Sequence, residues 1–268
     1  MSRWKLILSA LAMVMTTSAF TPIAHANNYQ DLWWNPNESG WGINISQQGD
    51  VMFATWFIYG AGNQPTWIFL SRADRSGATG NTFSGDIFQA TGTPFAVVPF
   101  VPLKESNLTK VGTATLVFSD SRTGTLTYTV NGAEVVKQIT RQVIGFYNLT
   151  GSYFGALKRD GSGCVSAALN GSSTNPAIYR VTHNVPTGSL TITEIGGSLC
   201  NFSGATTVFG SLIEGSGNFT CAAENITGTW TMREGRPTPN AFSALLALRP
   251  NGDSCTLSAA IGGLKTAE

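Results

Sequence analysis

Apolar and polar residues alternate with a period of two through most of this chain, and helical periodicity is almost absent. In residues 111 to 119, for example, one face takes Ala114, Leu116 and Phe118 while the other is mostly threonine. Alternation of this kind places successive side chains on opposite faces of a half-buried strand. Asn131-Gly132 supplies the positive-φ pair of a two-residue hairpin turn. The chain is therefore expected to be all-β, with antiparallel strands joined by tight turns.

The alternating segments predict eight strands in the first half of the chain and nine in the second. Those of the first half are expected near residues 41–47, 51–59, 65–71, 82–90, 95–101, 111–119, 123–130 and 134–142. Those of the second half are expected near residues 151–158, 164–169, 177–183, 188–194, 206–213, 217–221, 228–233, 241–249 and 254–260. Short consecutive strands predict two up-and-down meanders, each closed as a small barrel or folded as a sandwich.

The two halves differ in what can fill their cores. Five tryptophans lie within 35 residues of one another in the first half, whereas all four cysteines lie in the second. One core can be stabilised by burial of aromatic surface, and the other by smaller side chains and cross-links. We expect an aromatic-rich β domain at residues 27–146 and a disulfide-containing β domain at 147–268.

The first 26 residues have the pattern of a signal peptide. Arg3 and Lys5 form a positive region, residues 6–15 form an apolar run, and Ala24-His25-Ala26 provides a small-x-small cleavage site. Cleavage is expected after Ala26, giving a periplasmic or secreted product. The apolar run is shorter than the roughly 20 residues of a membrane span, so no membrane insertion is expected.

The four cysteines predict two disulfide bonds, because an even count behind an export signal is typical of oxidising compartments. Three connectivities are possible. We favour Cys200 with Cys221, which would join one hairpin, and Cys164 with Cys255, which would tie the first strands of the second domain to its last. The spacings match no metal or redox motif, so no metal site is expected.

Composition argues against several classes of function. Only 12% of residues are charged, with a net charge of +1, so no nucleic-acid partner is expected. The chain lacks the common phosphate-binding, nucleophile-elbow and zinc-protease motifs. His25 lies in the leader, and His183 at a strand end is more typical of a satisfied residue than of a catalytic one. No catalytic residue and no cofactor is therefore assigned.

The segment from Trp33 to Gly42 is the densest unusual stretch, with three indoles around a turn rich in Asn, Pro and Gly. Aromatic faces can stack on sugar rings or on aromatic groups of a protein, while amide and carboxylate groups offer hydrogen bonds. This predicts an exported, non-enzymatic protein that binds a neutral ligand, either an envelope glycan or a protein partner. An alternative is that the same segment plugs a barrel end and binds nothing. The candidate binding residues are Trp33, Trp34, Asn35, Asn37, Glu38, Trp41, Trp56, Tyr59 and Trp67.

Two further functions remain open from the sequence. Glu38 stands among aromatic residues, where burial could raise its pKa toward use as a general acid in a glycan or peptide hydrolase. Such an enzyme needs a second carboxylate about 5 to 9.5 Å away. The strands around Trp56 and Trp67 are apolar on both faces, which would suit a structural or assembly protein that pairs with another chain.

The run Trp-Trp-Asn-Pro-Asn-Glu-Ser-Gly-Trp-Gly at residues 33–42, followed by Gln-Gly-Asp at 48–50 and Phe-Ala-Thr-Trp-Phe at 53–57, resembles a β domain that recurs in exported proteins of proteobacteria. The resemblance extends over about residues 31 to 142. The second half is more loosely similar to a companion unit with cysteines flanking a Gly-rich hairpin. The resemblance to this uncharacterised family implies an exported protein built of β domains. It implies no activity.

Overall fold

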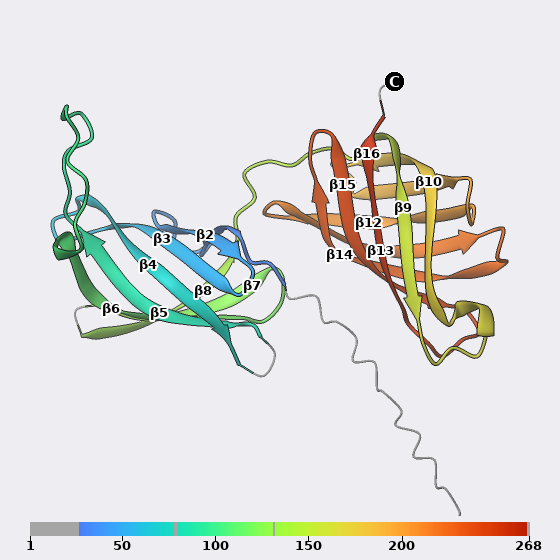
Figure 1. Cartoon of the computed structure of the whole chain (residues 1–268), viewed down its shortest axis with the longest axis horizontal. Helices are drawn as coiled ribbons and strands as arrows, with labels where there is room; N and C mark the ends of the chain where they lie inside the picture. The colour runs from blue at the N-terminus through green and yellow to red at the C-terminus, as the bar shows by residue number, and fades with distance from the viewer. Residues whose placement is uncertain (1–26, 78–79, 131, 267–268) are drawn as a thin grey trace, which may run out of the picture.

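The computed structural model contains two closed antiparallel β-barrels (Figure 1) and describes residues 27–77, 80–130 and 132–266. The all-β prediction with two antiparallel meanders is confirmed, and both meanders are closed as barrels. The expected signal peptide with its cleavage after Ala26 and the turn residue Asn131 lie outside the described residues. Neither of the short helices in the described ranges is long enough to cross a membrane.

In the first barrel every strand pairs with its neighbour in the chain, and β1 closes the sheet against β8. A short 3-10 helix, η1 (Glu105–Asn107), precedes the sixth strand. The strands are β1 (Asp31–Trp34), β2 (Gly42–Gln48), β3 (Val51–Tyr59), β4 (Pro65–Ser76), β5 (Thr82–Ala90), β6 (Leu108–Phe118), β7 (Thr123–Val130) and β8 (Ala133–Arg141).

The second barrel has the same up-and-down order, and β16 closes it against β9. A second 3-10 helix, η2 (Ala167–Leu169), follows its first strand. The strands are β9 (Gly151–Gly161), β10 (Gly171–Asn184), β11 (Ser189–Ile195), β12 (Cys200–Phe209), β13 (Leu212–Cys221), β14 (Ile226–Pro237), β15 (Ala241–Pro250) and β16 (Leu257–Lys265). Residues 142–150, between β8 and β9, contain the expected domain boundary.

Three strand predictions were wrong. Residues 95–101 form an irregular exposed segment, because nearby prolines remove the backbone donors that a paired strand needs. Residues 164–169 form a disulfide-linked turn with η2 rather than a strand. The expected strand at 206–213 is divided by a turn at Gly210, whose φ of 59° is characteristic of glycine. In addition, Asp31–Trp34 forms β1, where no strand was expected.

Aromatic rings fill one end of the first barrel. The rings of Tyr29 and Phe118 stack with centroids 3.8 Å apart, and Trp33 and Phe83 contact Phe118 at 4.9 and 6.1 Å. All four side chains are buried, and the indole Nε1 of Trp33 donates to the carbonyl oxygen of Tyr29 at 2.9 Å. We call these four residues the aromatic plug.

A buried arginine joins the seam of the same barrel, where Arg141 of β8 faces Trp33 of β1. Its guanidinium donates to Asp31 Oδ2 at 2.8 Å and to the carbonyl oxygens of Gln30 and Asn28 at 3.0 and 2.7 Å. The guanidinium carbon also lies 4.9 Å from the centre of the Trp33 ring. The arginine therefore fixes the chain entering β1 against the last strand, through charge-assisted hydrogen bonds.

The plugged end of the first barrel is the end that contacts the second barrel. Asp31 Oδ2 accepts hydrogen bonds from the backbone nitrogen and the hydroxyl of Ser211, both at 2.9 Å. The Glu214 carboxylate accepts from the hydroxyl of Ser121 and lies 3.5 Å from the Arg122 guanidinium. Polar contacts therefore join the β12–β13 hairpin to the plugged end.

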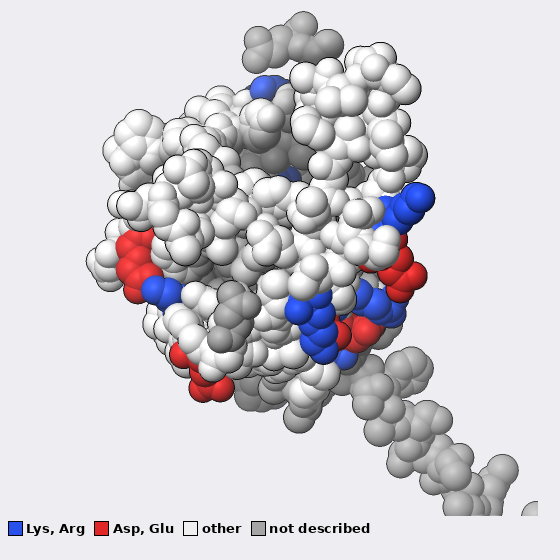
Figure 2. All heavy atoms as spheres, turned by 90° about the vertical axis from the view of Figure 1, so that its left-hand side faces the viewer, with Lys and Arg blue, Asp and Glu red and all other residues white. Residues whose placement is uncertain are grey.

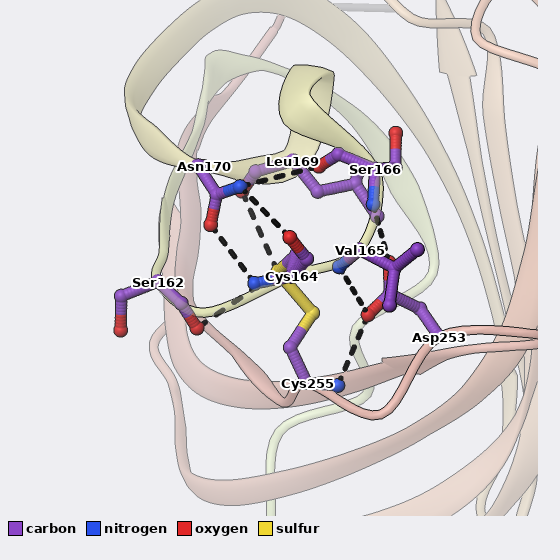
Figure 3. The surroundings of a disulfide bond; sticks show 8 residues. All are labelled: Ser162, Cys164, Val165, Ser166, Leu169, Asn170, Asp253 and Cys255. Atoms are coloured by element: carbon purple, nitrogen blue, oxygen red, sulfur yellow. Dashed lines mark hydrogen bonds between the residues drawn. A yellow bond between two sulfur atoms is a disulfide. The ribbon is translucent and has the colours of Figure 1, made fainter.

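Both disulfide bonds lie in the second barrel and have the favoured pairing. Cys200–Cys221 joins two residues that face each other in the β12–β13 ladder. Cys164–Cys255 joins the loop after β9 to the loop before β16 (Figure 3). The second bond therefore holds the first and last strands of the second barrel together.

The loops around Cys164–Cys255 are also held by side-chain hydrogen bonds (Figure 3). The Asp253 carboxylate accepts from the backbone nitrogens of Val165, Ser166 and Cys255 at 3.0 to 3.2 Å. The Asn170 amide accepts from the Cys164 nitrogen and donates to the Cys164 carbonyl oxygen. These bonds hold both ends of the disulfide in place in the folded protein.

The two disulfides should differ in their contribution to the free energy of unfolding. Cys164–Cys255 closes a loop of 91 residues and Cys200–Cys221 one of 21. In the loop-entropy account, their removal costs about 4 to 5 and about 3 kcal/mol respectively, a difference of about 1 kcal/mol. Urea denaturation of the Cys164→Ser/Cys255→Ser and Cys200→Ser/Cys221→Ser variants measures this order. Equal losses, or the reverse order, would contradict it.

Candidate ligand-binding site

The end of the first barrel opposite the aromatic plug is hollow. It holds a cavity of about 500 Å³, within the usual range for small-molecule sites. Strands β3, β4, β7 and β8 and the loop between β1 and β2 contribute to its wall. The lining residues are Ser39, Gly40, Trp41, Trp56, Ile58, Tyr59, Ile68, Tyr128, Val130, Ala133, Val135 and Lys137. We call this cavity the barrel mouth.

The barrel mouth is open because the inward-facing positions at this end carry mainly medium-sized side chains. Ile58, Val130 and Val135 occupy inward positions near strand ends and remain partly exposed. Trp56, one inward position deeper in β3, is buried. Side chains normally fill the interior of an eight-stranded barrel, and a gap in that filling can hold one small ligand. The floor and walls are thus apolar and aromatic.

The loop between β1 and β2 forms one side of the barrel mouth. It turns at residues 35–38, where the Glu38 nitrogen donates to the Asn35 carbonyl oxygen at 3.0 Å. The Asn35 side chain supports this turn by accepting from the Asn37 nitrogen at 3.0 Å. Gly40 has a φ of 112°, which favours glycine, and the chain then returns to place Trp41 at the opening.

An ion pair lies at the edge of the barrel mouth. Lys137 Nζ donates to Glu38 Oε2 at 2.5 Å, and the Trp41 indole nitrogen donates to the same oxygen at 3.2 Å. Lys137 Nζ also lies 5.7 Å from the centre of the Trp41 ring, within reach of a cation–π interaction. The hydrogen bond from Lys137 lowers the pKa of Glu38, which is thereby held as a carboxylate. The two charges neutralise each other.

The geometry does not favour an acid catalyst at Glu38. A general acid working at neutral pH needs a raised pKa, whereas the pKa of Glu38 is lowered. Its side-chain hydrogen bonds within the described residues go to Lys137 and Trp41, and neither is a carboxylate.

The nine residues expected to bind a ligand do not all lie at the barrel mouth. Three line the barrel mouth, namely Trp41, Trp56 and Tyr59, and Glu38 stands at its edge. Asn35 stabilises the adjacent turn, and Asn37 is exposed on it.

Three tryptophans of the predicted set do not line the cavity. Trp33 belongs to the aromatic plug and is fully buried, at the other end of the barrel from the cavity. Trp34 follows it in β1 and, by strand alternation, faces the outside of the barrel. Trp67 also lies outside, with 47% of its surface exposed. Its ring contacts that of Phe69, which in turn contacts Phe53 and Phe88 on neighbouring strands.

Sequence reasoning missed the contribution of the β7–β8 hairpin. Tyr128 and Val130 of β7 and Val135 and Lys137 of β8 line the barrel mouth. Alternation could identify their face of the strand, but not which end of the barrel would stay unfilled. Lys137 and Glu38 are 99 residues apart, so only the closure of the barrel brings them together.

The interior of the second barrel holds polar groups that are unusual for a core. Glu194 of β11 faces Tyr179 of β10, and both are buried. Glu194 Oε2 accepts from the Cys200 nitrogen at 2.9 Å, whereas Glu194 Oε1 and the Tyr179 hydroxyl have no hydrogen-bond partner among the described residues. Burial raises the pKa of both groups. His183 is buried too, and its ring nitrogens contact Thr206 Oγ1 and the backbone nitrogen of Leu149.

Cys164, Asp253 and Cys255 bring two sulfurs and a carboxylate within 4.8 Å of one another, as a metal site would. The two sulfurs are bonded to each other and are therefore not thiolate ligands. The Asp253 carboxylate is already engaged by backbone nitrogens (Figure 3). This cluster is a structural clamp.

No protein-family model and no curated protein matches this sequence. Among solved structures, the chain is similar to a candidate outer membrane protein of Bacteroides fragilis, with a TM-score of 0.31 and 14% identity over 84% of this chain and 88% of the other. It is also similar to a double mutant of the vaccine antigen transferrin binding protein B of Haemophilus parasuis, with a TM-score of 0.36 and 8% identity. That match covers 85% of this chain and 61% of the other. Likenesses this distant carry no conclusion about function.

Glu194 should make stability depend on pH. Its raised pKa means that the folded protein binds a proton more tightly than the unfolded chain, so stability falls as pH rises above about 4.5. Glu194→Gln removes this loss. We expect no gain in stability below pH 4.5, and a gain that grows above it until Glu194 is ionised in the folded protein as well. Urea denaturation between pH 4 and 8 measures the difference.

Glu134→Gln, on the exposed surface of β8, is the matched control and should leave the pH profile unchanged. A Glu194→Gln gain that is the same at pH 4 and pH 8 would show that the effect does not come from ionisation.

Proposed function

We propose that this chain is an exported binding protein that holds a neutral ligand with a flat apolar face in the barrel mouth. The observation that carries the proposal is the cavity of about 500 Å³, walled by Trp41, Trp56, Tyr59 and Tyr128 and by aliphatic side chains. Concave, mainly apolar sites with a few polar groups are typical of small-molecule binding. The proposal includes no catalytic residue, metal or cofactor.

The chemistry of the wall favours a sugar ring over a charged ligand. The C–H face of a sugar can pack on an indole or phenol ring, while its hydroxyls hydrogen-bond to tyrosine hydroxyls. Lys137 is the one lysine or arginine in the lining, and Glu38 already neutralises it. An anionic ligand would have to compete with the Glu38 carboxylate for the Lys137 ammonium group. We therefore propose a neutral glycan of the cell envelope as the ligand.

Two features support export. Both disulfides require an oxidising compartment to form and persist, which in bacteria lies outside the cytoplasm. The leader pattern in residues 1–26 is consistent with this location. We propose a periplasmic or extracellular protein with a glycan at the first barrel and a cross-linked second barrel as its support.

Replacement of one indole at the barrel mouth should remove binding without unfolding the protein. Trp41→Ala deletes a wall of the cavity, and we expect affinity for the bound glycan to fall at least about tenfold. Trp67→Ala removes an indole from the outer surface and is the matched control, with affinity unchanged. Titration of neutral envelope oligosaccharides, followed by intrinsic fluorescence, measures both. Circular dichroism verifies the fold of each variant.

Equal affinity of Trp41→Ala and the parent protein would contradict the barrel mouth as the site. If the parent protein bound none of the neutral oligosaccharides, the proposed ligand class would be wrong.

A further inference from the structure

A long apolar loop projects from the open end of the first barrel. It comprises residues 91–104, between β5 and η1, and extends away from the barrel wall (Figure 1). Phe95 is 98% exposed and Val98 is 91% exposed. We call this loop the apolar arm, and its exposed large side chains are Phe95, Val97, Val98, Phe100, Val101 and Leu103. An exposed apolar group of this extent marks an interaction surface in soluble proteins.

The apolar arm carries no charge over most of its length. Residues 91 to 103 include no Lys, Arg, Asp or Glu, and the first charged residue is Lys104 at the base. Figure 2 looks at this end of the molecule, where the charged side chains gather along the sides and the lower part of the face. Glu105 follows Lys104, so the base of the arm carries one charge of each sign. An uncharged apolar tip above a charged base suits a surface that has an apolar interior and polar headgroups.

Part of the arm's backbone either lacks a donor or is hydrogen-bonded. Pro94, Pro99 and Pro102 have no N–H group to leave unpaired. The Val97 nitrogen donates to the Pro94 carbonyl oxygen at 3.0 Å, and the Thr93 hydroxyl donates to the Val101 carbonyl oxygen at 3.0 Å. The N–H groups of Phe95, Ala96 and Val98 donate no hydrogen bond within the described residues, so they fit only shallow insertion at the hydrated level of the headgroups. A narrow, uncharged projection whose tip side chains are almost fully exposed suits a medium that surrounds it, as a lipid interface does.

We infer that the apolar arm inserts its tip into the interfacial region of a lipid bilayer and docks the protein on a membrane surface. Phe95 and Val98 would enter the acyl boundary, and Lys104 would remain at the level of the headgroups. The docking is driven by apolar burial rather than by charge, so it needs no anionic lipid. It places the barrel mouth, at the same end of the barrel, beside the bilayer. The inference does not depend on the glycan proposed for the barrel mouth.

Vesicle flotation tests the inference directly. The full mature chain is mixed with phosphatidylcholine vesicles, and the fraction that floats with the lipid is measured. The parent protein should float, and Phe95→Ser/Val98→Ser should lower its partition coefficient by at least about tenfold. Ile144→Ser/Phe146→Ser removes exposed apolar side chains from the segment between the barrels and is the matched control, with flotation unchanged.

A site-specific probe separates insertion from incidental association. All four cysteines are in disulfides, so Phe95→Cys introduces a unique thiol for a polarity-sensitive fluorophore. Its emission should increase and shift to the blue with phosphatidylcholine vesicles, while the same label at Ile144→Cys should not respond. Failure of the parent to float, or equal responses at the two labels, would overturn the inference.

Two other results distinguish this inference from related ideas. If the parent protein is a dimer by light scattering and Phe95→Ser/Val98→Ser makes it a monomer that floats as before, the arm is a protein interface and the inference is wrong. Glycan titration without vesicles should give the same affinity for the parent and for Phe95→Ser/Val98→Ser. A parent protein that floats with the vesicles but binds no glycan would contradict the proposed function and leave membrane docking intact.

Discussion

The buried contact between Arg141 and Asp31 connects three parts of the structure. Arg141 belongs to the last strand of the first barrel, and its guanidinium binds the chain that enters β1 and lies against Trp33. Asp31 balances this charge and also accepts two hydrogen bonds from Ser211 of the second barrel. A buried guanidinium without its carboxylate would be strongly unfavourable, so the two must be placed together. Closure of the barrel, its aromatic plug and its contact with the second barrel thus depend on one another.

This arrangement gives the first barrel two different ends. The interior of the plugged end is filled by rings, and its rim contacts the second barrel. The free end has medium-sized inward side chains, a cavity and the apolar arm. The one charge pair at the barrel mouth is internally balanced, which leaves aromatic faces and hydroxyls as the groups available for recognition. The second barrel has two disulfides and, against the expectation of a core of smaller side chains, an aromatic core of its own in which Tyr153, Tyr179 and Trp230 are buried.

The alternation of residues was sufficient to predict an all-β fold and two meanders, because side-chain period is a local property. Disulfide pairing was also accessible, since Cys200 and Cys221 flank one hairpin. The arm was mistaken for a strand because its apolar residues outweighed the prolines that prevent pairing. The barrel mouth was only half predicted, because the contact of Lys137 with Glu38 depends on barrel closure. Likewise, nothing local in the sequence distinguishes Trp33 in the core from Trp41 at the opening.

The difference between the two ends can be measured with a neutral, water-soluble paramagnetic probe and the indole N–H signals of the folded protein. The Trp41 signal should lose intensity, because its ring lines an open cavity. The signals of Trp33 and Trp230 should persist, since both rings are buried in their cores. Attenuation of Trp33 as strong as that of Trp41, or full protection of Trp41, would contradict a first barrel plugged at one end and open at the other.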